Sequence, residues 1–416
     1  MRTSILLILY LSSLLSTYST AVATIEQDAY IWQRTWSEKL ERALIEHVNE
    51  LNGFTVLAAE ITPTPEGAQV SFCSIDFPTL VDCQLPITLA IRVGQYPGPF
   101  SNDAPTTQTL LKLVREVLQR AQQAGVEPAA IEIDFDCATS KLTGYQHWLQ
   151  QLRIQLGTTP LSITTLPTWM TRPDNFRQLV HTADRYVLQV HSIQRPTFSS
   201  KAIKLCDAKL ALKWAQQADA FGQTFQVALP TYGYLLGYNA DGELISVSAE
   251  DTAATQGNDQ HYKEVRSDPI EMAQLVCRFN ELPLPNCSGI IWYRLPVGEE
   301  RLNWDAATWR AVRLGQGILP NWRASVVTQS DGLVEILLEQ SSPIASDPPD
   351  KVTLHWQGAA AIAWDGQRNF TVTHSGENAL EWKRPSNSPP LSQGESWTLG
   401  WVRFAQTPSL SLTVTP

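Results

Sequence analysis

The sequence has few basic residues and no cluster of them. Its 416 residues include 31 Lys and Arg against 41 Asp and Glu, which gives a formal net charge of −10 at pH 7. No run of Lys or Arg interrupts this acidic balance. Proteins that bind nucleic acid or anionic membranes depend on basic patches, so the composition argues against both kinds of partner.

Several catalytic motifs are also missing. The sequence has no Gly-x-Ser-x-Gly elbow, no Walker phosphate loop, no His-Glu-x-x-His zinc motif and no Cys-x-x-Cys pair. Each of these patterns holds a nucleophile, a phosphate or a metal at a fixed spacing. We therefore expect neither a cofactor nor a catalytic metal. A cation held by Glu60, Asp134 and Asp136 is the alternative.

Long apolar runs are absent after the N-terminus. Ile5 to Leu15 form an apolar stretch that is much shorter than the ~20 residues of a membrane span. Arg2 precedes it, and Ala21-Val22-Ala23 then match a small-x-small cleavage site. This pattern predicts a signal peptide at 1–23 and export to the periplasm or the medium, with no membrane span left after cleavage. A membrane anchor is the alternative.

Six cysteines agree with export, because disulfides persist in oxidising compartments. Their spacing suggests two local loops, Cys73–Cys83 and Cys277–Cys287, which leaves Cys137–Cys206 as a third pair. Six buried free thiols are the alternative.

Residues 24–316 alternate between strand-like and helix-like segments. The expected strands cover 28–34, 54–61, 87–94, 130–136, 161–167, 184–191, 224–234 and 288–296, with a small hairpin near 68–75. The expected helices cover 37–51, 105–124, 142–156, 173–182, 206–220, 268–281 and 304–314. This order predicts a (β/α)8 TIM barrel. An open doubly wound sheet is less favoured, because no Gly-x-Gly-x-x-Gly follows the first strand.

The pattern changes in residues 320–416. Short alternating apolar segments are separated there by Pro, Gly, Asp and Ser turns, which predicts a small all-β, sandwich-like domain. The expected strands are 324–329, 333–340, 351–357, 369–375, 379–384, 396–404 and 410–414.

Active sites of such barrels lie at the C-terminal ends of the strands. The polar and aromatic residues expected there are candidates for the site. They are Trp32, Gln33, Arg34, Glu60, Arg92, Asp134, Asp136, Thr165, Trp169, Gln189, His191, Tyr232, Trp292, Tyr293 and Arg294.

The fourth expected strand carries the most specific signal. Glu132, Asp134 and Asp136 occupy alternate positions, so their side chains share one face of the strand. We expect this face to point into the barrel, where close carboxylates repel and raise at least one pKa. A raised pKa suits a general acid, so we assign catalysis to these three residues. The alternative is an internal ion-pair network with Arg34, Arg92 or Arg294.

Aromatic residues at the strand ends form a second signal. Trp32, Trp169, Tyr232 and Trp292 suit stacking on sugar rings, although packing beneath loops is an equal alternative for each. His191 is a candidate hydrogen-bonding or acid–base group, and a structural role is the more common one for a single histidine.

The strand with the three acids resembles the D-x-x-D-x-D-x-E signature of the chitinase-like barrels, glycoside hydrolase family 18. Its last three acids fall on Glu132, Asp134 and Asp136. The stretches VALPTYGY and GIIWYRLP resemble the seventh and eighth strands of that family, whose tryptophan on the sugar subsite falls on Trp292. The resemblance implies Asp136 as the acid and Asp134 as the group that orients the substrate.

The sequence departs from that signature in several positions. Asp136 stands where the family has Glu, Ala129 stands at its first Asp, and His191 replaces a Tyr. An N-acetylhexosamine substrate therefore does not follow from the resemblance.

The overall layout is more similar to the bacterial family known as domain of unknown function 3142. Members of that family are exported barrels with an opening A-Y-x-W-Q-R segment, a D-[FY]-D-C strand end and a C-terminal β region. Ala29 to Arg34 and Asp134 to Cys137 match these two motifs. The resemblance implies no activity.

From these observations we expect a glycoside hydrolase-like protein that acts on an oligo- or polysaccharide of the cell envelope or the surroundings. Asp134, Asp136 and Glu132 are its predicted catalytic residues. A carbohydrate is the only partner class that the residues indicate, and they do not indicate an oligomeric state. A catalytically inactive carbohydrate-binding barrel and an envelope scaffold protein are the alternatives.

Overall fold

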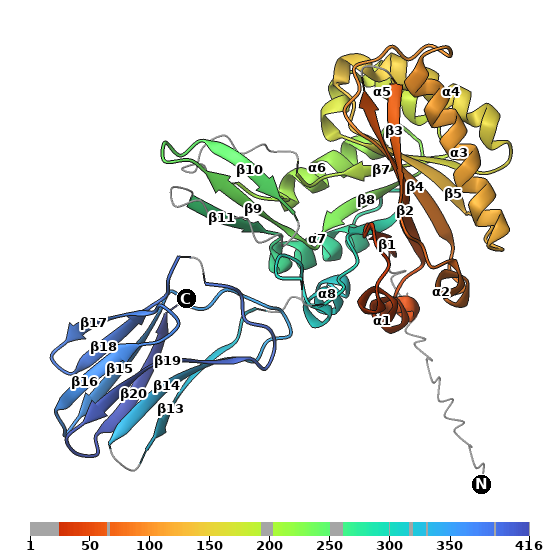
Figure 1. Cartoon of the computed structure of the whole chain (residues 1–416). Coiled ribbons are helices and arrows are strands. Elements are labelled where there is room, and N and C mark those ends of the chain that lie inside the picture. The colour runs from red at the N-terminus through yellow and green to blue at the C-terminus, as the bar shows by residue number, and fades with distance from the viewer. Residues whose placement is uncertain are drawn as a thin grey trace, which may run out of the picture.

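The computed structural model describes residues 25–64, 67–192, 203–249, 261–298, 300–315, 319–329, 332–386 and 388–415. The predicted signal peptide at 1–23 lies outside this range. The described chain forms a large α/β barrel and, to one side of it, a separate β domain (Figure 1).

Eight parallel strands close into the predicted barrel, since β1 pairs with both β12 and β2. Their order is β1-β2-β4-β5-β6-β7-β8-β12. Most of these strands are buried apolar runs, as is typical of parallel sheets covered by helices. They are β1 (Glu26–Ile31), β2 (Gly53–Thr64), β4 (Ile87–Val93), β5 (Ala130–Phe135), β6 (Leu161–Thr165), β7 (Arg185–Gln189), β8 (Phe225–Pro230) and β12 (Cys287–Tyr293).

The helices surround the strands, and several of them begin at a polar residue whose side chain caps the first turn. Ser37, the N-cap of α1, accepts a hydrogen bond from the backbone of Leu40, and Asp268 caps α7 in the same way. No described helix has the length and apolar character that crossing a membrane requires. The helices are α1 (Glu38–His47), α2 (Phe77–Asp82), α3 (Pro105–Gln123), α4 (Leu142–Leu156), α5 (Pro173–Val180), α6 (Ala208–Asp219), α7 (Pro269–Glu281) and α8 (Ala306–Arg313).

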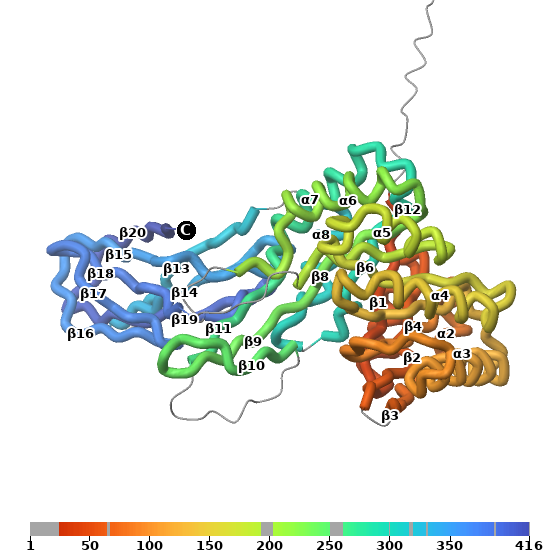
Figure 2. Tube along the Cα trace, turned by 90° about the horizontal axis from the view of Figure 1, so that it is seen from above, coloured from red at the N-terminus to blue at the C-terminus, as the bar shows by residue number. Residues whose placement is uncertain are grey.

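Two additions decorate the barrel. The expected hairpin is β2 with the antiparallel β3 (Gly67–Phe72). The chain after β8 forms a three-stranded antiparallel sheet that projects from the C-terminal face of the barrel (Figures 1 and 2). Its strands are β9 (Gly233–Tyr238), β10 (Leu244–Ser248) and β11 (His261–Arg266).

The barrel wall separates two clusters of buried side chains. The larger cluster lies between the strands and the helices. The smaller one fills the barrel and includes Tyr30, Trp32, Leu57, Val187 and Ile291. Because side chains alternate along each strand, a shift of one residue moves a side chain from one cluster to the other.

The β domain is the predicted sandwich of two four-stranded antiparallel sheets, β13-β14-β19-β16 and β17-β18-β15-β20. Its described strands include β16, which was not among the expected strands and none of whose side chains is fully buried. One hydrogen bond, from the Ala345 amide to the Thr308 hydroxyl at 2.8 Å, joins the domain to α8. The strands are β13 (Trp322–Thr328), β14 (Leu333–Gln340), β15 (Lys351–Gln357), β16 (Ala361–Gly366), β17 (Thr371–Gly376), β18 (Ala379–Lys383), β19 (Ser396–Phe404) and β20 (Ser409–Thr415).

The disulfide predictions are wrong: Cys73, Cys83, Cys137, Cys206, Cys277 and Cys287 are all free thiols. Close spacing in the sequence does not bring the paired sulfurs together. Cys73 packs against the cluster inside the barrel, whereas Cys83 packs against the outer core. The Cys277 thiol donates to the carbonyl of Gly315, while the Cys287 thiol faces the carbonyl of Gly289. Cys137 and Cys206 are buried as separate thiols.

A glycine at the seam between the last and first strands gives a test of barrel closure. Gly289 lies opposite Glu26, and a Cβ at Gly289 would be 2.7 Å from the Glu26 carbonyl oxygen. We expect Gly289→Ala to lower the free energy of unfolding by about 1–3 kcal/mol, because the backbone at the seam must shift. Denaturant unfolding measures the change. Gly376→Ala is the control, since its Cβ would meet only the Ala379 side chain at 3.8 Å, and equal stability of both variants would contradict the seam contact.

Candidate active site

The three acids of the fourth barrel strand, Glu132, Asp134 and Asp136, lie on the face that the sequence predicts; we call this row the acidic ladder. Strand β5 turns Glu132 and Asp134 into the barrel, and Asp136 follows just beyond the end of the strand. Exposure increases along this row: Glu132 is fully buried, Asp134 is partly buried and Asp136 is exposed at the mouth. The three carboxyl groups therefore stand at increasing distance from the barrel interior, and each meets a different environment.

Glu132 is enclosed in the barrel and fully hydrogen-bonded. The Tyr30 hydroxyl donates to one carboxyl oxygen at 2.6 Å, and the Ser162 hydroxyl donates to the other at 2.8 Å. Burial raises the pKa of Glu132 to about 7, although both hydrogen bonds and the charge of Arg185 act in the opposite direction. Burial and the neighbouring Glu132 also raise the pKa of Tyr30. A proton is therefore held beneath Asp134 up to about neutral pH.

Asp134 lies one layer above Glu132. The Thr164 hydroxyl donates to it at 2.8 Å, and the Arg92 guanidinium is 4.0 Å from its other oxygen. Burial raises the pKa of Asp134, and the hydrogen bond from Thr164 and the charge of Arg92 oppose this rise. The carboxyl group is thus fixed in orientation and remains accessible from the mouth, where its side chain keeps 16% of its surface exposed.

Part of the alternative ion-pair network is present beside the acids. Arg34 makes two contacts with Glu60, of 2.6 and 3.1 Å, and Arg92 lies 3.8 Å from Glu60. Glu60 reaches the mouth because the pairing of β2 with β4 shifts between Leu57 and Ala59, so both Leu57 and Glu60 face inward. Arg294 does not join this network, because it pairs with Glu300 at 3.1 Å.

A cavity of about 240 Å³ opens above these groups, and we call it the barrel-mouth cavity. Its polar lining includes Asp134, Asp136 and Arg92, and its aromatic lining includes Trp32 and Tyr232. Of the predicted residues, Gln189 and His191 also lie there. Its lining residues are Tyr30, Trp32, Arg92, Asp134, Asp136, Thr164, Val187, Gln189, His191, Ser192, Ala228, Tyr232, Tyr234 and Tyr293.

His191 belongs to a hydrogen-bonded cluster at one wall of this cavity. Its Nδ1 is 3.3 Å from both the Ser192 and the Tyr232 hydroxyl oxygens. The Ser192 oxygen is also 2.6 Å from Tyr232 and 2.7 Å from the Tyr234 hydroxyl. Burial lowers the pKa of His191 to about 3, so its ring is neutral at physiological pH. A neutral ring of this kind orients hydroxyl groups and does not supply a proton as an acid.

The assignment of Trp292 to a sugar subsite is wrong. Ile291 and Tyr293 face the barrel interior, so Trp292 between them faces the helices and is fully buried. Its indole N–H donates to Gln27 at 3.0 Å, and its ring contacts Trp304. The aromatic residue of β12 that reaches the cavity is Tyr293, which stacks on His191 at a ring distance of 5.3 Å.

Trp169 does not line the cavity either. It is 1% exposed, its indole N–H donates to the carbonyl of Cys137 at 3.1 Å, and its ring packs against Tyr145. Its contacts hold the chain just after Asp136, so it supports the loop that carries this acid. The predicted role in sugar stacking is therefore corrected to a structural one.

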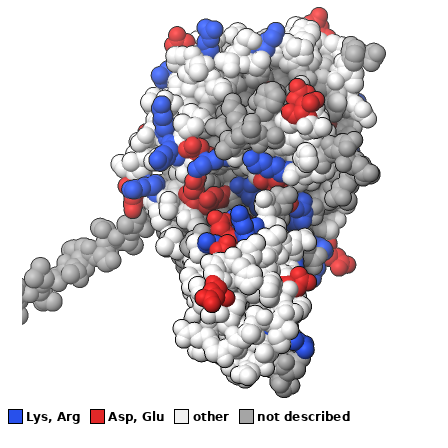
Figure 3. Space-filling view, turned by 90° about the vertical axis from the view of Figure 1, so that its left-hand side faces the viewer, with Lys and Arg blue, Asp and Glu red and all other residues white. Residues whose placement is uncertain are grey.

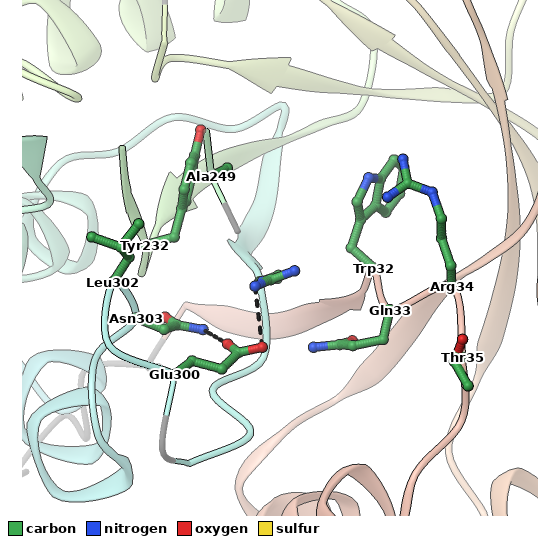
Figure 4. Close-up of a pocket in the computed structure, with 10 residues that line it drawn as sticks. Trp32, Gln33, Arg34, Thr35, Tyr232, Ala249, Glu300, Leu302 and Asn303 are labelled. Carbon is green, nitrogen blue, oxygen red and sulfur yellow. Dashed lines mark hydrogen bonds and ion pairs between the residues drawn. The ribbon is translucent and has the colours of Figure 1, made fainter. Parts of the chain in front are cut away.

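A second cavity of about 420 Å³ adjoins the first and shares Trp32 and Tyr232 with it (Figure 4). The chain after β1 contributes Gln33 and Arg34 to it, and the chain after β12 contributes Arg294. Arg34 and Arg294 thus line this second cavity, and neither is among the residues that line the barrel-mouth cavity. Its lining residues are Trp32, Gln33, Arg34, Thr35, Tyr232, Ala249, Arg294, Glu300, Leu302 and Asn303.

Charged side chains of both signs gather across the middle of one face of the molecule (Figure 3). Much of the rest of that face carries no charge. Within the part of the chain that the structure describes, no three His, Cys, Asp or Glu side chains are grouped as metal ligands would be.

The sequence did not identify several residues of the site. Tyr30 and Thr164 contact the acids, Ser192 and Tyr234 complete the cluster at His191, and Gln33 was named only by its position. Strand alternation relates Tyr30 to Trp32, so Tyr30 carried a usable signal. No local pattern identifies Ser192 as a site residue, because its position depends on the path of the chain after β7.

Comparison with known proteins gives a family but no activity. A family model described as domain of unknown function (DUF3142) matches residues 86–298, which run from just before β4 to beyond β12 and include all three acids. This match confirms the resemblance expected from the opening and strand-end motifs. No curated protein matches the chain.

Solved structures that are similar to the chain share little sequence identity with it. The spore cortex-lytic enzyme SleL of Bacillus cereus is 14% identical, with 70% of this chain and 74% of that chain covered and a TM-score of 0.48. A chitinase from Chromobacterium violaceum is 16% identical, with 71% and 100% covered and a TM-score of 0.48. A chitinase from Bacteroides thetaiotaomicron is 11% identical, with 71% and 96% covered and a TM-score of 0.48.

The buried proton on Glu132 predicts a pH dependence of stability. In the unfolded chain the glutamate carboxyl group has its ordinary pKa of 4.5, whereas burial in the folded protein raises the pKa of Glu132 to about 7. Raising the pH through this window therefore destabilises the folded state, by about 3 kcal/mol from this group. Glu132→Gln stays neutral, so we expect the stability of the wild type relative to this variant to fall by that amount between pH 4.5 and 8.

Chemical unfolding at several pH values measures this difference. Glu127→Gln is the matched control, because Glu127 is exposed in the loop before β5 and its variant should follow the wild-type profile. Parallel profiles for the wild type and Glu132→Gln would contradict a buried, protonated Glu132.

Proposed function

The chain belongs to the DUF3142 family, and from the geometry of its barrel mouth we propose that it is a glycoside hydrolase acting on an oligo- or polysaccharide. The observation that carries the proposal is the placement of Asp134 and Asp136 together in the lining of one cavity at the C-terminal ends of the strands. Most glycosidases use a pair of carboxyl groups that flank the bond to be cleaved.

We assign the acid–base role to Asp136. It lies at the exposed rim, where the glycosidic oxygen of an entering chain would arrive. In this mechanism Asp136 gives its proton to the leaving oxygen as the bond from that oxygen to the anomeric carbon breaks. A water molecule then gives its hydroxyl to the anomeric carbon and its proton to Asp136, which restores the acid.

Asp134 acts on the other side of the same bond. Thr164 and Arg92 hold its carboxyl group in a fixed orientation below the rim. From that position Asp134 either attacks the anomeric carbon or orients a nucleophile carried by the substrate. Arg92 offsets part of its charge, which keeps the carboxylate usable in a partly buried place.

Glu132 adjusts the charge beneath this pair. Its pKa of about 7 keeps it largely neutral in mildly acidic conditions. Asp134 therefore does not face a second full negative charge one layer below. The aromatic rings of Trp32, Tyr232 and Tyr293 give the cavity apolar surface of the kind that packs against the C–H face of a sugar.

Substitution of the two aspartates tests the proposal. We expect the purified mature protein to release sugars from at least one member of a panel of peptidoglycan, chitin-type and exopolysaccharide fragments. Asp136→Asn and Asp134→Asn should each lower kcat by about 100-fold or more, because each removes a group that acts on the breaking bond. Product release, followed by mass spectrometry, measures the effect.

Asp174→Asn is the matched control, since Asp174 is an exposed residue in the first turn of α5. It should retain wild-type turnover, and circular dichroism should show that all three variants are folded. Unchanged turnover in both site variants would contradict the assigned chemistry. Glycan binding without turnover, retained in both site variants, would instead support an inactive carbohydrate-binding barrel.

Export is part of the proposal, and it depends on residues 1–23 alone. We expect the mature chain to begin at Thr24 and to be found in the periplasm or the medium. N-terminal sequencing of protein recovered from cell fractions measures both properties, and a full-length chain in the cytoplasmic fraction would contradict export.

A further inference from the structure

We propose that the second cavity, beside the barrel-mouth cavity, binds a second and uncharged sugar ring of the same glycan. The inference rests on the proposed function, because it assumes that a glycan enters the barrel mouth. The second cavity lies outside the acidic ladder, and Gln33 is the residue in it that determines the preferred length of the glycan.

The two cavities are connected by their shared walls. Trp32 and Tyr232 line both, so a chain that lies over these two rings extends from one cavity into the other. At about 420 Å³ the second cavity is larger than the barrel-mouth cavity, whose volume is about 240 Å³. Together the two cavities provide space of the size that small-molecule sites occupy, roughly 300–1,000 Å³.

Three polar atoms of residues that line the second cavity lack partners within the described chain. Both the amide nitrogen and the amide oxygen of Gln33 are buried and make no hydrogen bond to a described residue. The indole nitrogen of Trp32 is in the same state, in a residue that is only 7% exposed. Buried donors and acceptors without partners are uncommon and unfavourable, so these three atoms indicate a polar occupant.

The arrangement of these atoms indicates hydroxyl groups. A glutamine amide presents one donor and one acceptor side by side, which two neighbouring hydroxyl groups of a sugar ring match. Figure 4 shows the Gln33 side chain extending across the cavity toward Glu300. The two oxygens of Glu300 accept from Arg294 at 3.1 Å and from Asn303 at 2.8 Å, so this carboxylate is held in place as a further acceptor.

The charges indicate that the ring is neutral. Each guanidinium that lines the second cavity already has a carboxylate partner, Glu60 for Arg34 and Glu300 for Arg294. A carboxylate on the sugar would therefore compete with Glu300 for Arg294, and the negative charge of Glu300 would repel it. Hydroxyl groups satisfy the amide and the carboxylate without adding charge.

Titration calorimetry with the full mature protein tests the inference. The probes are neutral gluco-, manno- and xylo-oligosaccharides of one to six rings, and oligogalacturonides as the acidic counterpart. For the neutral series that binds, we expect affinity to rise at least tenfold between one ring and two or three rings. Gln33→Leu should remove this gain, and Gln33→Glu, which keeps the acceptor and the shape, should reduce it in part.

Gln122→Leu is the matched control, because Gln122 is exposed on α3, and it should keep the full gain with length. Failure of the wild type to bind any glycan would overturn the proposed function, and the inference with it. Binding of a single ring with no gain from a second, or a gain that survives Gln33→Leu, would overturn only the second subsite. Tighter binding of oligogalacturonides than of every neutral series would overturn the neutral class.

Discussion

The enclosure of Glu132 inside the barrel is the constraint on which the rest of the site depends. Its carboxyl group is hydrogen-bonded to Tyr30 of β1 and to Ser162 of β6, so three strands must close around it. An acid in such a place is tolerated only when it is protonated or fully bonded, and here both conditions contribute. The closed barrel thus holds a protonated Glu132 beneath the more accessible Asp134 and Asp136.

From Glu132 outward, the exposure of the three acids increases toward the barrel mouth. Asp134 is fixed by Thr164 and faces Arg92, whereas Asp136 lies at the rim. The same strand ends that present these acids also present Trp32 and Tyr232, which form walls of both cavities. Proton control, orientation and glycan contact therefore come from separate layers of one barrel. The loops after β1 and β12 add the groups that distinguish the second cavity.

Some of the site could be predicted because strand geometry is local. The alternation of Glu132, Asp134 and Asp136 with Ile131, Ile133 and Phe135 indicated the inward face of β5, and the barrel order followed from the sequence of strands and helices. Alternation failed at the eighth strand, where Trp292 and Tyr293 are both aromatic and the pattern does not show which one faces inward. The inward position of Glu60 depends on the irregular pairing near Leu57, which no local pattern shows.

The sequence by itself determined the alternation of strands and helices in the barrel, the change to an all-β region near residue 320 and the row of acids on β5. These properties depend on periodicity and turn residues, which neighbours in the chain specify. Only the tertiary structure decided that the six cysteines stay apart, that Trp169 and Trp292 are buried, and that Gln33 lines a cavity while its amide has no partner among the described residues. Those outcomes depend on strand register and on the packing of segments distant in the chain, and no local pattern encodes either.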